Sequence, residues 1–157
     1  MRVEVVRSSR RKKTVQASVV EGVLRVRIPS SKSRAEEEHW VDVMQERIER
    51  QLRSDDIDLV ARGRELANEL NLSVPKRITF SDRQKQRWGS CTPGTGSVRI
   101  SSRAASFPGW VLDYIIVHEL AHLEVPDHSP AFWRLVQRYQ LAERARGFLI
   151  AKNLGGN

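Results

Sequence analysis

The sequence contains a single cysteine, no long hydrophobic run and no aromatic residue before Trp40. Cys91 has no partner for an intrachain disulfide, which excludes the class of small secreted domains that disulfides hold together and favours a reducing cytosol. No apolar run approaches the roughly 20 residues that a membrane-spanning helix requires. The first residues also lack the apolar segment of a signal peptide. We therefore expect a soluble, cytoplasmic protein with no membrane partner.

The positive charge of the chain is concentrated at one end. The net charge is +8, and residues 1–34 contain ten Lys and Arg against two Glu. The run Arg10-Arg11-Lys12-Lys13 lies within this segment. A basic cluster can attract nucleotides, nucleic acid or acidic proteins, although such a run more often forms only a solvated loop. Because no aromatic residue accompanies the cluster, it offers no platform on which bases could stack.

The first half of the chain alternates between strand and helix signals. Residues 3–7 are expected to form a strand, and residues 14–20 and 23–28 a β-hairpin that turns at Glu21-Gly22. Ser33 and Glu36 match a capping box at the start of a helix. The expected buried stripe of that helix recurs every fourth residue: Trp40, Met44, Ile48 and Leu52.

The second half predicts a small antiparallel sheet followed by helices. Ser54-Asp55-Asp56 is expected to cap a second helix, from about Ile57 to Leu70. The expected later elements are a strand at 77–80, a hairpin of 87–92 and 97–101, a helix after residues 107–109, and helices at about 131–139 and 141–152, with residues 155–157 frayed. This order predicts an α+β fold. We expect one domain over residues 1–157, with a basic β-rich segment at 1–30 and a functional core at 76–152.

Three of the four histidines fall within eleven residues of the third expected helix and the turn after it. His118 and His122 are four residues apart, so a helix presents both imidazoles on one face, where they can bind one metal ion. Pro126 should end this helix, and His128 then lies at the corner before a new helix that begins near Ser129-Pro130. Three protein ligands plus a water is the open arrangement of a catalytic zinc, so we expect one zinc per chain.

Glu119 follows the first of these histidines and predicts catalysis rather than a structural metal site. Its carboxylate can act as the general base toward a water that the metal activates. The HExxH-x5-H spacing is shared with the metzincins, but Val125 stands where those enzymes have glycine, and both methionines precede the motif instead of following it. A glutamate as third ligand is also disfavoured, because Glu143 is the only acidic residue after Asp127.

The chain resembles the YgjP-like metallopeptidase domains, a group related to the WLM and SprT-like families. The resemblance is carried by WGSC at residues 88–91, HELAH at 118–122 and HSPAFW at 128–133, together with the basic opening of the chain. It covers most of the sequence. It implies a zinc fold in which His118, His122 and His128 bind the metal and Glu119 is the catalytic acid and base. One departure is the pair Ser101-Ser102, where the family often has Asn.

A zinc-dependent hydrolase that acts on peptides or proteins is the function that these patterns favour. We expect Arg87, Trp88, Tyr114 and Arg103 to bind substrate, although each of them could serve only packing or solvation. Two alternatives stay open: a nucleoside triphosphate hydrolase that binds phosphates through the basic segment, and a non-catalytic nucleic-acid-binding module with structural zinc. The intact Glu119 argues against the last of these, because structural zinc has no use for that carboxylate.

Overall fold

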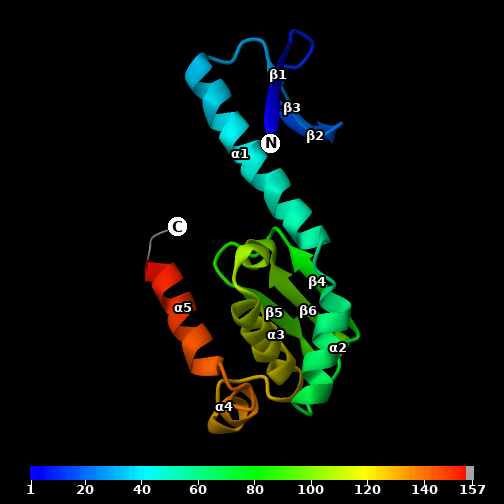
Figure 1. The fold of residues 1–157 in the computed structure, drawn as a ribbon, viewed down its shortest axis with the longest axis vertical. Helices are drawn as coiled ribbons and strands as arrows, with labels where there is room; N and C mark the ends of the chain where they lie inside the picture. The colour runs from blue at the N-terminus through cyan, green and yellow to red at the C-terminus, as the bar shows by residue number, and fades with distance from the viewer. Residues whose placement is uncertain (155–157) are drawn as a thin grey trace. The chain divides into compact units, whose positions relative to one another are not determined.

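The computed structural model describes residues 1–154, and its contacts group into two compact units (Figure 1). The first unit comprises Met1–Leu52 and the second begins at Arg53. Each unit contains a three-stranded sheet, joined by one long helix in the first unit and by several helices in the second, which confirms the α+β class. The prediction that residues 1–157 act as one domain stays a prediction, and the expected fraying of residues 155–157 lies outside the described residues.

The first unit is built from a sheet and one long helix. Its strands are β1 (Arg2–Ser8), β2 (Gln16–Val20) and β3 (Val23–Pro29), in the order β1-β3-β2. β1 pairs with β3 in parallel and β2 pairs with β3 antiparallel. The β2–β3 turn places both Glu21 and Gly22 at positive φ, 50° and 76°, which is the backbone that a two-residue hairpin turn requires. The predicted hairpin is therefore confirmed.

The helix α1 (Arg34–Asp55) begins at the predicted capping box. The Ser33 backbone N–H donates to the Glu36 carboxylate at 2.8 Å, and the Glu36 N–H donates to the Ser33 hydroxyl at 3.2 Å. Met44 of this helix is buried with three residues of β3 that have no exposed surface: Leu24, Val26 and Ile28. The predicted stripe was wrong at its last position, because Leu52 is 48% exposed.

The second unit has the order helix, strands, helices. Its elements are α2 (Leu59–Glu69), β4 (Arg77–Ser81), β5 (Gly89–Thr92), η1 (Pro93–Thr95), β6 (Ser97–Ser101), η2 (Ser102–Ser106), α3 (Gly109–Glu124), α4 (Pro130–Val136) and α5 (Ala142–Leu154). The strand order is β4-β6-β5, so β5 lies at one edge. The sheet is mixed rather than wholly antiparallel, because β4 runs parallel to β6 and only β5 is antiparallel.

The boundary between the first two helices also differs from the prediction. Ser54-Asp55-Asp56 does not cap α2, since α1 continues to Asp55. The cap is Asp58, whose carboxylate accepts a hydrogen bond from the Ala61 N–H at 3.0 Å. Several polar residues in a row offered competing caps, and the sequence did not show which of them would bond.

The helix α3 lies at the centre of the second unit and packs against the sheet, α2, α4 and α5 (Figure 1). Residues 111–117 are buried without interruption, so this helix is covered on nearly every side. The buried Asp113 carboxylate accepts two hydrogen bonds of 2.6 Å from the Arg62 guanidinium of α2. This bidentate pair fixes α3 against α2 and neutralises the buried Asp113 carboxylate.

Membrane insertion finds no support in the helices of residues 1–154, since none of them has the length and hydrophobicity of a bilayer-spanning segment.

Candidate metal centre and active site

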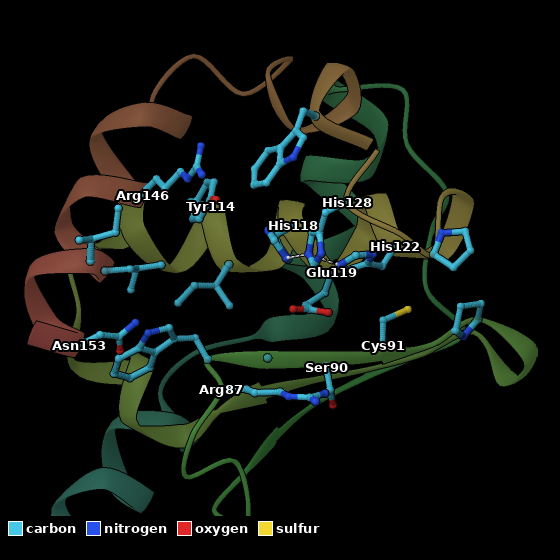
Figure 2. Close-up of a pocket in the computed structure, with 18 residues that line it drawn as sticks. Arg87, Ser90, Cys91, Tyr114, His118, Glu119, His122, His128, Arg146 and Asn153 are labelled. Atoms are coloured by element: carbon cyan, nitrogen blue, oxygen red, sulfur yellow. Dashed lines mark hydrogen bonds between the residues drawn. The ribbon is translucent and has the colours of Figure 1, made fainter. Parts of the chain in front are cut away.

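Three histidine side chains converge at the end of α3 (Figure 2). His118 and His122 lie one turn apart on this helix, and His128 lies in the connection to α4. The helix ends at Glu124 and α4 begins with Pro130 at its first position, so the short connection turns His128 back toward the other two. Their ligand-capable nitrogens all lie within 4.8 Å of one another. The structure thus brings together the three predicted ligand residues.

The imidazoles are oriented to bind a zinc ion rather than to form hydrogen bonds with one another. The Nδ1–H of His122 donates to the Val125 carbonyl at 3.1 Å, which leaves the lone pair on its Nε2. The His128 Nε2 lies 3.2 Å from this atom and 3.4 Å from the His118 Nε2. Two nitrogens on a tetrahedral zinc, each about 2.0–2.1 Å from the ion, are separated by roughly 3.3–3.4 Å. The three side chains therefore fit this metal.

Aromatic residues of α4 hold the imidazole planes. The Phe132 ring stacks on His122 with centroids 4.3 Å apart and 23° between the planes. The Trp133 ring stacks on His128 at 5.9 Å and 28°. Contacts of this kind fix ligand orientation without adding a ligand. Trp133 therefore lies where it can orient the His128 imidazole.

Burial also favours the protonation state that a metal requires. It lowers the pKa of His118 to about 4, with smaller contributions from the positive charges of His122, His128 and Arg146. Burial likewise lowers the pKa of His122. Both imidazoles are therefore neutral near pH 7, which is the form that binds a metal ion.

Glu119 lies between the histidine cluster and the edge strand β5 (Figure 2). Its side chain is buried, and burial raises its pKa to about 7, although the positive charge of Arg87 opposes this shift. A carboxylate with this pKa can both accept and return a proton near neutral pH. The approach of Glu119 to β5 depends on Gly89, since a Cβ at that position would lie 2.9 Å from the Glu119 Cγ.

A cavity of about 770 Å³ opens beside the histidines and Glu119. Arg87, Trp88 and Tyr114, three of the four predicted substrate-binding residues, line it. Arg103 is not among its lining residues. The Arg103 guanidinium instead donates to the carbonyls of Gln84 and Lys85 and packs over the Trp88 ring at 4.4 Å. It therefore supports the loop before β5 and the Trp88 ring from outside the cavity.

Cys91 lines the same cavity but does not belong to the histidine cluster. Burial raises the pKa of its thiol to about 11, and the negative charge of Glu119 adds to the shift. The thiol is therefore protonated at neutral pH and is a poor metal ligand in that form.

Two features of the site were not apparent from the sequence. Gly89 was visible only as part of WGSC, and nothing local indicated that Glu119 would pack against it. Arg146 of α5 also lines the cavity, although it lies 28 positions after His118. No local pattern marks it, because the packing of α5 against α3 brings it there.

Comparison with known proteins gives three results. The family model described as "YgjP-like, metallopeptidase domain" matches residues 6–142. The metallopeptidase zymogen abylysin of Pyrococcus abyssi is similar in fold, with a TM-score of 0.52 and 21% identity over 59% of this chain and 91% of its own. The metallopeptidase zymogen jannalysin of Methanocaldococcus jannaschii has a TM-score of 0.52 and 23% identity over 62% of this chain and 98% of its own. The comparison with curated proteins found no match.

Proposed function

Because the chain belongs to the YgjP-like metallopeptidase domain family, we propose that it is a zinc-dependent peptidase whose active site lies at the end of α3. The observation that carries the proposal is the convergence of three Nε2 atoms, with separations of 3.2 and 3.4 Å, beside a buried glutamate. A structural zinc site has no need for such a carboxylate or for a cavity beside it. The combination supports catalysis.

The proposed roles of the histidines follow from their geometry. His118, His122 and His128 would hold one zinc ion, with Val125 fixing the tautomer of His122 through its carbonyl. When bound, zinc lowers the pKa of a coordinated water and polarises the carbonyl under attack. Phe132 and Trp133 would keep the imidazoles in place as substrate enters and leaves.

Glu119 is the proposed general base and acid. It would take a proton from the attacking water and return it to the nitrogen of the leaving amine, so that one peptide bond is broken per water consumed. Burial raises the pKa of this carboxyl, which makes it a stronger base toward the water than an exposed glutamate would be. Gly89 provides the space in which the carboxylate approaches β5.

The edge strand β5 is the proposed backbone-binding element. Its neighbour in the sheet is β6, and Gly89, Ser90 and Cys91 also line the cavity. An extended peptide can add to such an edge through main-chain hydrogen bonds, largely independent of its sequence. A protein or peptide substrate therefore fits this edge better than a small molecule would.

The two alternative functions rest on other parts of the chain. The phosphate-binding role was expected of residues 10–13, which lie in the first unit and are not among the cavity-lining residues. Binding of nucleotides or nucleic acid by this segment stays a prediction. No observation in the second unit favours these alternatives over peptide hydrolysis.

An activity panel on the zinc-loaded protein tests the proposal. It should contain unfolded casein, a set of short peptides and the nucleoside triphosphates, each assayed with wild type and with Glu119→Gln. We expect peptide hydrolysis that falls by roughly two orders of magnitude or more in the variant, because an amide cannot accept the proton. Both proteins should contain the same amount of zinc. Turnover of nucleotides without any peptide hydrolysis, or near-wild-type activity of Glu119→Gln, would overturn the proposal.

A further inference from the structure

The cavity has a second polar feature besides the metal centre, the guanidinium of Arg146. The residue is exposed on α5, and its guanidinium packs over the Trp133 ring at 4.5 Å. Among the described residues it forms no ion pair and no hydrogen bond. The carboxylate of Glu143, on the same helix, already accepts a hydrogen bond from Gln137 at 2.7 Å. A cation that lines a cavity without a protein anion is available to an anionic ligand.

Tyr114 places a hydroxyl on the same rim of the cavity (Figure 2). It precedes His118 by one turn of α3, and its ring centroid lies 6.0 Å from that imidazole. Within residues 1–154 its hydroxyl forms no hydrogen bond, although the residue is only 4% exposed. A phenolic hydroxyl without another partner can donate a hydrogen bond to a ligand. The two side chains together offer several hydrogen-bond donors, and the carboxylates whose charges reach Tyr114 are those of Glu143 and Glu119.

The wall beside these donors is apolar. Leu149 and Ile150 lie three and four residues after Arg146 on α5, so they share its face of the helix. Trp88 and Ile115 line the same cavity, and Ile150 is 52% exposed. This arrangement of a cation next to apolar surface suits a ligand that carries an anionic group and an apolar side chain together.

The direction of β5 indicates which end of a peptide would meet this wall. A peptide that pairs antiparallel with β5 has its C-terminal end beside Gly89, where the strand begins. Trp88, just before this point, contacts Phe107, which in turn contacts Phe148 of α5. Figure 2 shows Arg146 and Asn153 on the Arg87 side of the site and Cys91 on the opposite side. The C-terminal side of a bound peptide would therefore face α5.

The guanidinium also lies close to the proposed metal centre. Trp133 contacts Arg146 at 4.5 Å and lies 6.1 Å from the His118 ring, so a single aromatic side chain separates them. An anionic group held by Arg146 would therefore lie only a short distance along an extended peptide from the bond that is cut.

We propose that Arg146 and Tyr114 bind the α-carboxylate of a peptide whose last residue has an apolar side chain, so that the enzyme acts as a carboxypeptidase. The inference rests on the proposed peptidase function. Water adds its oxygen to the penultimate carbonyl carbon, the last peptide C–N bond breaks, and the released amino group takes up the proton. Free C-terminal amino acid and the shortened peptide are the products.

Matched peptides test the inference directly. Two peptides of the same sequence that end in leucine, one as the free acid and one as the amide, are assayed with the zinc-loaded wild type. We expect the free acid to be hydrolysed at least about tenfold more efficiently, because the amide lacks the charge that Arg146 would bind. Release of free leucine, identified by mass spectrometry, locates the cut.

Variants then assign the preference to specific groups. Arg146→Ala should lower kcat/KM for the free acid by roughly 10- to 100-fold and leave the amide little changed. Tyr114→Phe should have a smaller effect in the same direction. Arg144→Ala is the matched control, because Arg144 also lies on α5 and packs near a tryptophan, Trp110, but does not line the cavity. It should retain the wild-type preference.

Binding provides a readout that does not depend on turnover. Zinc-loaded Glu119→Gln should bind the free acid more tightly than the amide by calorimetry, and adding Arg146→Ala should abolish the difference. Zinc content and circular dichroism show whether each variant is folded.

The outcomes separate this inference from the proposed function. Hydrolysis of internal bonds with no dependence on the C-terminus would overturn the inference alone. If Arg146→Ala lowered kcat/KM equally for the acid and the amide, Arg146 would act on the reacting carbonyl, and the inference would be overturned. Turnover of nucleotides that depends on Arg146 would also overturn the inference. Failure to hydrolyse or bind any peptide would overturn the peptidase function together with the inference.

Discussion

Both units contain a hairpin with an important glycine, and the two glycines are required for different reasons. Gly22 in the first unit has φ of 76°, and a Cβ there would meet nothing within 4 Å. Its role is local, since the turn needs a residue that tolerates positive φ. Gly89 in the second unit has no such backbone requirement, but a Cβ there would meet Glu119 at 2.9 Å. One glycine shapes its own turn, and the other makes room for a side chain 30 positions away.

The charged groups of the two units also differ, because those of the first unit lie at its surface and two carboxyl groups of the second are buried. Exposed ion pairs in the first unit join residues of neighbouring elements, such as Arg7 with Glu37 at 2.6 Å and Arg25 with Glu4 at 2.9 Å. Pairs of this kind contribute about 0–1 kcal/mol each. In the second unit Asp113 and Glu119 are buried, and each occupies a defined place around α3. The comparison teaches that the charged groups of the first unit pair at its surface, whereas the second unit holds the groups whose chemistry burial alters.

Replacing a histidine by alanine in each unit should give the largest difference between the units. His122→Ala should reduce zinc from about one ion per chain to a small fraction of that, because two ligands remain where zinc needs three. His39→Ala is the matched control, since His39 is exposed on α1 and outside the cluster. Elemental analysis after dialysis measures the content of each protein, and His118→Ala and His128→Ala should behave like His122→Ala. Full zinc content in His128→Ala would remove that residue from the ligand set.

The comparison of the glycines can be tested by adding one methyl group. Gly89→Ala should displace the Glu119 carboxylate and lower peptide hydrolysis by roughly 10- to 100-fold, since small displacements of a catalytic group have effects of this size. Gly94→Ala, in the same hairpin, should leave activity nearly unchanged because a Cβ there meets nothing within 4 Å. Zinc content should stay at the wild-type level in both. Unchanged activity in Gly89→Ala would show that the carboxylate finds another productive position.

The sequence predicted those features that depend on neighbouring residues. The Glu21-Gly22 turn, the Ser33–Glu36 capping box and the i, i+4 histidines each depend on spacing along one element, and all three are present. The position of His128 followed from Pro126 and Pro130 on either side of it. Local stereochemistry is sufficient for such features.

The features that the sequence missed depend on contacts between distant elements. The parallel pairing of β4 with β6, the contact between Gly89 and Glu119, and the position of Arg146 in the cavity all require the second unit to be assembled. The stripe on α1 failed at Leu52 for a related reason, because periodicity shows which face is apolar and not how far the partner surface extends.

Neutralising the basic cluster tests whether these charges take part in the chemistry of the second unit. Replacing Arg10, Arg11, Lys12 and Lys13 with glutamine should change kcat/KM for a small neutral peptide by less than about twofold, because these residues are not among those that line the cavity. Binding of a single-stranded DNA oligonucleotide, if wild type shows any, should weaken, and its salt dependence should become shallower. Loss of peptide hydrolysis with fold and zinc content intact would place the cluster in the active site and favour the nucleotide-hydrolase alternative.

The smallest expected effect concerns the start of α1. Ser33→Ala should destabilise the first unit by about 1 kcal/mol, since it removes the cap that the Glu36 N–H uses. Hydrogen exchange of the α1 amides measures the change, and Gly94→Ala serves as a control in the second unit.

The carboxylate of the capping box also makes the start of α1 sensitive to acid. The hydrogen bond from the Ser33 N–H, followed by the interaction with Lys32, lowers the pKa of Glu36 from 4.5 to about 2. Because the folded pKa lies below the unfolded one, the stabilisation is complete above about pH 4.5 and is lost as the pH falls toward 2. An NMR titration of the first-turn amides should therefore show the helix start loosening over this interval. Glu36→Gln should remove this dependence, because glutamine keeps an acceptor but does not titrate, whereas Glu38→Gln on the same helix should retain it. A wild-type profile that is flat between pH 4.5 and 2 would contradict the coupling and would leave the capping box as a purely geometric feature of the first unit.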